Sequence, residues 1–109
     1  MIYGKLNSLA PFATQESWDN SGLLVGDPDA EVKTALVVLD ITAEAVREAR
    51  EIGAELIISH HPVIFHPLKK VESGSVVWKL AQAGISAICA HTNLDKARGG
   101  VNDCLAAAL

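Results

Sequence analysis

Three short apolar runs, each followed by a polar residue, constrain the fold of this chain most strongly. The runs are Thr34–Leu39, Leu56–Ser59 and Ile85–Ala90. Helical patterns separate them, from Ala43 to Ile52 and from Gly74 to Ala83. Runs that are apolar along their whole length are typical of strands covered on both faces, and their alternation with helices favours parallel pairing. We therefore predict an α/β fold, a layered α/β sandwich with a mixed, partly parallel sheet.

The segments around this alternation predict a further strand and a helix near each end of the chain. Ile2–Phe12 has apolar residues at helical spacing up to a proline, and Leu23–Val25 predicts a short strand. Val101–Leu109 has its apolar residues at the positions of a core-facing helix. Because no glycine, basic residue or proline closes this last helix, we expect the natural polypeptide to continue beyond it.

Length and composition are those of a single globular domain. The 109 residues suffice for one α/β domain over residues 1–109, and no stretch approaches the ~18 consecutive apolar residues of a membrane span. A net charge of −4 without a basic face disfavours nucleic-acid binding. The amino terminus lacks a secretory pattern, and Cys89 and Cys104 resemble the small buried residues of a reducing compartment. We therefore expect a cytoplasmic protein that does not bind membranes.

Side chains with metal-binding chemistry follow the second and third apolar runs. His60 and His61 come after the second run, and His91 follows the third, with Asp95 four residues later. Since α/β sheets bind ligands at the carboxyl ends of their strands, these side chains are expected to converge. Pro62 favours an extended backbone at His61, so that neighbouring imidazoles point to opposite sides and suit two ions ~4 Å apart. We predict a two-metal site with His60, His61 and Asp95 as ligands.

Other interpretations of the polar and aromatic residues stay open. Taken alone, the adjacent histidines are equally consistent with a polar loop that ends a strand. His91 is either a ligand or a residue outside the ligand set that orients a water molecule and relays protons. His66 lies in a loop that favours a solvated role, and Asp40 precedes a helix, where an acidic residue is favoured electrostatically. Trp18 and Trp78 lie outside any aromatic cluster of the sequence, which favours packing over stacking on a ligand.

Five stretches carry a specific resemblance to a known family. They are Ser17–Gly26, Leu39–Thr42, Ile58–Phe65, His91–Asp95 and Gly99–Asp103. In these stretches the chain resembles the GTP cyclohydrolase 1 type 2 homologue family, the Nif-three-like proteins. The resemblance implies two divalent metal ions bound by His60, His61 and Asp95, and mixed nitrogen and oxygen donors suit zinc, manganese, iron or cobalt. It also implies that the chain is the amino-terminal half of a duplicated two-domain fold, without the second half that supplies a further histidine and glutamate.

The resemblance also implies a function. Family members look like metal-dependent hydrolases, and the family name proposes a GTP cyclohydrolase activity. The residues themselves select no substrate. The resemblance implies a nucleotide or related small molecule, on which ion-activated water could act with His91 relaying protons. The alternative is a non-enzymatic metal-dependent interaction or regulatory protein, whose ions stabilise a fold or an assembly. We expect a homo-oligomer, and we expect the isolated chain to be catalytically poor because its ligand set is incomplete.

Overall fold

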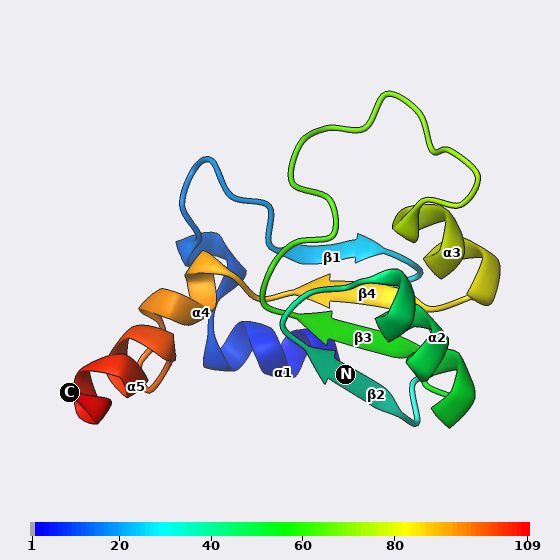
Figure 1. Cartoon of the computed structure of the whole chain (residues 1–109). Coiled ribbons are helices and arrows are strands. Elements are labelled where there is room, and N and C mark those ends of the chain that lie inside the picture. The colour runs from blue at the N-terminus through cyan, green and yellow to red at the C-terminus, as the bar shows by residue number, and fades with distance from the viewer. Residues whose placement is uncertain (1) are drawn as a thin grey trace.

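The computed structural model describes residues 2–109 and contains one four-stranded sheet with helices on both faces (Figure 1). The elements in chain order are α1 (Ile2–Leu9), the 3₁₀ turn η1 (Phe12–Thr14), β1 (Gly22–Val25), β2 (Ala35–Val38), α2 (Ala43–Ile52), β3 (Leu56–Ser59), α3 (Val76–Ala83), β4 (Ser86–Cys89), α4 (Thr92–Lys96) and α5 (Val101–Ala108). Each predicted strand and helix is present. The first helix is shorter than predicted, because the chain leaves it before Pro11 and continues into η1.

The sheet is mixed, as the sequence predicts. Its strand order is β1-β4-β3-β2, in which β2, β3 and β4 are parallel neighbours and β1 joins β4 antiparallel. The right-to-left arrows of β2, β3 and β4 end at the same edge of the sheet in Figure 1. The chain therefore brings the segments that follow these three strands to one place.

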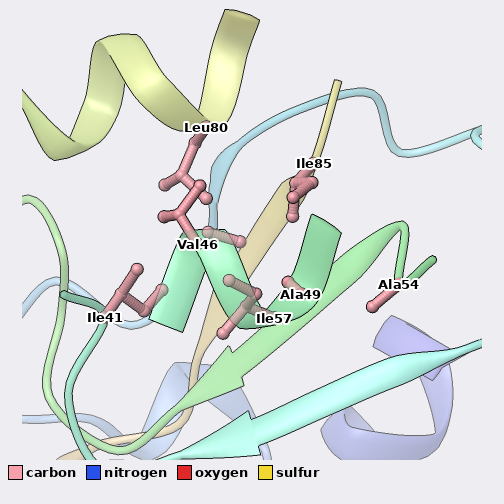
Figure 2. Close-up of a cluster of buried hydrophobic side chains, with 8 residues drawn as sticks. Ile41, Val46, Ala49, Ala54, Ile57, Leu80 and Ile85 are labelled. Carbon is pink, nitrogen blue, oxygen red and sulfur yellow. The ribbon is translucent and has the colours of Figure 1, made fainter. Parts of the chain in front are cut away.

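One face of the sheet is covered by α2 and α3. Thr42 caps α2 by accepting a hydrogen bond from the Ala45 amide, and Gly53 ends the helix in a left-handed conformation. Leu80 of α3 and Ile57 of β3 are fully buried in the core on this face (Figure 2). The opposite face is covered by α1 and η1, whose side chains pack around a cluster of Phe12, Leu56 and Ile88.

Two apolar faces that were expected to be covered, on β2 and on α5, are exposed in the structure. β2 was expected to be covered on both faces, but it is an edge strand, and its Val37 side chain is 73% exposed. Helix α5 was expected to face the core, but it has no buried residue and lies beyond α4, away from the sheet (Figure 1). Leu105 and Cys104 are accordingly exposed, whereas Cys89 is buried as predicted. An apolar pattern indicates which face of an element avoids water but not which partner covers it, and that limit explains both errors.

Within residues 2–109, no helix has the length and the apolar character that crossing a bilayer demands.

Gly26 is a position where the backbone requires glycine. Its φ is +116°, and an added Cβ would lie 2.9 Å from the Cα of Ser86 on β4 and nearer still to the Ser86 side chain. We expect Gly26→Ala to lower the free energy of unfolding by about 3 kcal/mol, because backbone strain and the clash add together. Gly53→Ala is the matched control: it also has a positive φ, +73°, but its Cβ would meet no atom within 4 Å. It should cost only about 1 kcal/mol in urea denaturation, and equal losses for the two variants would contradict the prediction.

Candidate metal centre

Three histidines meet at the carboxyl edge of the parallel strands. His60 directly follows β3, His61 comes next, and His91 lies two residues beyond the end of β4. The ring centroids are 5.3 Å apart for His60 and His61, 5.1 Å for His60 and His91, and 5.6 Å for His61 and His91. One nitrogen from each ring lies within 4.8 Å of those of the other two. The three imidazoles are therefore close enough to share metal ions.

Each of these histidines is oriented by an acceptor at its Nδ1 atom. His60 Nδ1 lies 2.8 Å from the carbonyl oxygen of Ala90, His61 Nδ1 lies 2.7 Å from Asp40 Oδ1, and His91 Nδ1 lies 2.9 Å from Asp19 Oδ1. Carbonyl and carboxylate oxygens only accept hydrogen bonds, so Nδ1 is the donor in all three. In the neutral rings the Nε2 atoms then carry lone pairs. This arrangement, in which a carboxylate or carbonyl fixes the ring from behind, is typical of metal-binding histidines.

Asp95 approaches the cluster from the short helix α4. Its Oδ1 lies 3.3 Å from His60 Nε2, and both side chains are partly buried. When His60 donates through Nδ1, its Nε2 lone pair faces a carboxylate oxygen, and two such acceptors so close together attract a cation. The structure therefore brings His60, His61 and His91 into one cluster and places Asp95 against His60. The sequence did not predict α4, although a helical turn there was the condition under which His91 and Asp95 would share a face.

Asp19 orients His91 through a hydrogen bond, a role that the sequence did not predict. Its side chain is inaccessible to solvent and accepts hydrogen bonds from His91 Nδ1, from the amide and hydroxyl of Thr92, from the amide of Asn20 and from the Ser21 hydroxyl. Burial alone would raise the pKa of the Asp19 carboxyl, but the hydrogen bonds from Thr92, His91 and Asn20 outweigh it and hold this pKa well below its usual range. Asp19 is therefore a fixed negative charge behind His91.

Asp40 also differs from its predicted role. The start of α2 is capped by Thr42, whereas the Asp40 carboxylate turns to His61. Both side chains are about half exposed, so this contact orients the His61 ring more than it stabilises the fold.

The remaining polar residues near this edge lie outside the cluster. His66 is exposed and stacks on Phe65, in agreement with its predicted solvated position. The thiol of Cys89 is buried and donates to the His60 carbonyl oxygen at 3.2 Å. Burial, with a smaller contribution from the Asp19 charge, raises the pKa of Cys89 to about 12. The donors that cluster at this edge are the imidazole nitrogens of the three histidines, with the Asp95 carboxylate beside His60, and the Cys89 thiol lies outside this group.

The histidine side chains are partly exposed, from 19% for His91 to 46% for His61, so that ions can reach the cluster. A hollow of about 400 Å³ lies elsewhere, on the α1 side of the sheet between Tyr3, Val32 and Ile88, and the histidines do not line it.

Known proteins resemble this chain over nearly its whole length. The family profile described as Duf34/NIF3 (NGG1p interacting factor 3) matches residues 1–109. A protein of Staphylococcus aureus (strain COL) named "GTP cyclohydrolase 1 type 2 homolog" is 49% identical over 107 residues, which are 95% of this chain but 29% of that protein. The chain thus spans less than a third of the length of this curated relative.

Solved structures show the same fold. A crystal structure of a hypothetical protein from Staphylococcus aureus superposes with a TM-score of 0.91 at 47% identity and covers 97% of this chain and 36% of its own. A Bacillus cereus protein described as related to NIF3 gives a TM-score of 0.91 at 40% identity over 98% of this chain and 30% of its own. These shares agree with the expectation that the chain corresponds to one part of a larger, two-domain fold.

Proposed function

Because the chain belongs to the Duf34/NIF3 family, we propose that it binds two divalent metal ions through His60, His61 and Asp95. We further propose that these ions form the active site of a metal-dependent hydrolase that acts on a nucleotide or related small molecule. The observation that carries the proposal is the common orientation of three clustered imidazoles. Each is held at Nδ1 by an acceptor, so that Nε2 is left for an ion in His60 and His61 and for a proton in His91. The nucleotide comes from the name of the relatives, GTP cyclohydrolase 1 type 2 homolog.

The donor set fits divalent transition metals. Imidazole nitrogen with carboxylate oxygen suits zinc, manganese, iron and cobalt, and it does not choose among them. His60 neighbours His61, His91 and Asp95, so that the one ion its Nε2 atom can ligate would lie next to the carboxylate of Asp95. His61 has a half-exposed side chain at the outer side of the cluster, where a second ion would be more open to solvent.

The residues of the chain also fit a hydrolytic role. Divalent ions bound here would supply Lewis acidity and lower the pKa of water toward ~7. His91 is placed to move protons, because the Asp19 carboxylate behind Nδ1 stabilises the positive charge that the ring gains when Nε2 accepts a proton.

A second function is favoured by the family description, NGG1p interacting factor 3, which names an interaction instead of a reaction. In that case the ions stabilise a binding surface, and the metal-loaded chain binds a protein partner without nucleotide turnover. Assay of nucleotide hydrolysis by metal-loaded protein separates the two functions, since only the hydrolase releases product.

Metal binding itself is tested by calorimetric titration with Zn²⁺ and Mn²⁺. We expect about two ions per chain, in keeping with a two-metal site, and we expect His61→Ala to lose the outer ion and to retain weaker binding of the other. His66→Ala is the matched control, because His66 is exposed in the adjacent loop and lies outside the cluster. Equal stoichiometry and affinity for the parent chain and His61→Ala would refute the assignment.

A further inference from the structure

Two exposed aromatic side chains lie beside the histidine cluster. Trp18 is 59% exposed and Phe65 is 46% exposed. Their ring centroids are 6.2 Å apart, and the Trp18 ring lies 6.4 Å from the His91 ring with the planes at 77°. Trp18 and Phe65 come from separate loops but form one apolar surface next to His91, which we call the aromatic wall.

Hydrogen bonds hold the two loops of the aromatic wall together. The side-chain amide of Asn20, two residues after Trp18, donates to the carbonyl oxygen of Ile64, the residue before Phe65, at 2.7 Å. Asp19, the immediate neighbour of Trp18, is fixed by its buried contacts with His91 and Thr92. These contacts hold the backbone on both sides of the aromatic wall, which lowers the entropy that the two loops lose when a ligand binds.

Exposed aromatic rings lack the favourable free energy that burial in the core would have contributed. The sequence favoured a packing role for Trp18, but its ring remains mostly in water although it is among the largest apolar groups of the chain. Trp78, the other tryptophan, is also partly exposed, but it belongs to α3, at the other end of the sheet from the histidine edge (Figure 1). The aromatic wall thus combines two properties of a ligand surface, which are exposure and a position beside His91 of the histidine cluster.

On the basis of the proposed metal-dependent function, we propose that Trp18 and Phe65 together bind the planar heterocyclic base of a nucleoside or nucleotide. Because their ring planes are 52° apart, the base stacks on one ring and contacts the other at its edge. Flat aromatic rings stack on any base, because every base has a π face. The base would lie against the wall, beside His91, whose ring is roughly perpendicular to the Trp18 ring. The wall then selects molecules that contain a planar ring over phosphates or sugars that lack one.

Fluorescence of Trp18 tests the proposal directly. In a Trp78→Phe background Trp18 is the single tryptophan, since the chain has two. Guanosine is expected to quench its emission, whereas tripolyphosphate, which has no ring, leaves it unchanged. Phe65→Leu should weaken guanosine binding roughly 5- to 100-fold, the range for loss of one stacking partner. Leu68→Ala is the matched control, because Leu68 is an exposed apolar residue of the same loop and lies outside the wall, and it should bind guanosine as the parent does.

A second variant guards against an effect of Phe65 on loop structure. Trp18→Leu, examined by equilibrium dialysis, should weaken guanosine binding to a similar extent and leave calorimetric metal binding unchanged. Unaltered guanosine affinity in both Trp18→Leu and Phe65→Leu, or equal quenching by tripolyphosphate, would overturn the proposal. Guanosine carries no phosphate that could reach an ion, so its binding tests the aromatic wall separately from the metal site. If the chain bound guanosine but no metal, the metal site would be refuted and the role of the aromatic wall would be supported.

Discussion

Replacing Asp19 with alanine is expected to lower the free energy of unfolding by about 3 kcal/mol, because several buried donors lose their charged acceptor at once. The Thr92 amide and hydroxyl and the His91 Nδ1 atom all donate to this carboxylate from a helix start that is 72 or more residues away in the chain. Chemical denaturation with urea measures the loss. Asp29→Ala is the matched control, since Asp29 is an exposed carboxylate, and it should change stability by less than about 0.5 kcal/mol.

The pH dependence of the same variant identifies the cause. The folded-state pKa of Asp19 is lowered from its usual value, so its contribution is fully present above the unfolded-state pKa of ~3.9 and is lost as the pH falls toward the folded-state value. The stability gap between the parent chain and Asp19→Ala should therefore shrink steadily below about pH 4. A gap that stayed constant down to pH 2 would show that Asp19 acts through packing alone and would contradict the charge-based account.

The strands and the site's location could be predicted because both follow from local patterns. β3 and β4 are continuous apolar runs, α2 has its own cap and stop residues, and parallel neighbours bring His60 and His91 to one edge. The sequence pattern within a single segment was therefore enough to predict each strand, the helix α2 and the position of each histidine at a strand end.

The support of the histidines could not be predicted in the same way. Asp19 and His91 are 72 residues apart, and Asp40 and His61 are 21 apart, so that no periodicity relates them. The role of Asp40 was assigned from its place before α2, the strongest local signal, and the tertiary contact with His61 replaced it. Trp18 was similarly judged from its neighbours in sequence, whereas Phe65 reaches it only through the fold.

His60→Ala is expected to have the largest effect on metal affinity, a loss of about 1000-fold or more, which corresponds to roughly 4 kcal/mol. His60 is the central member of the cluster: its ring is the nearest neighbour of both other histidine rings, and its Nε2 faces Asp95 Oδ1. Removing it should therefore abolish binding of the ion that its Nε2 atom ligates, whereas His61→Ala should weaken mainly the binding of the outer ion. Competition against a metallochromic indicator extends the measurement to the tightly bound range.

His60→Gln distinguishes loss of a metal ligand from loss of structure. The glutamine amide can still donate to the Ala90 carbonyl oxygen, the acceptor that His60 Nδ1 uses, but it supplies no imidazole nitrogen to an ion. We expect His60→Gln to keep the thermal midpoint of the metal-free parent chain within a few degrees and to lose metal as His60→Ala does. Metal affinity restored by glutamine would refute the role of the His60 imidazole as a ligand. A larger loss of metal affinity in His61→Ala than in His60→Ala would place the centre of the site at His61.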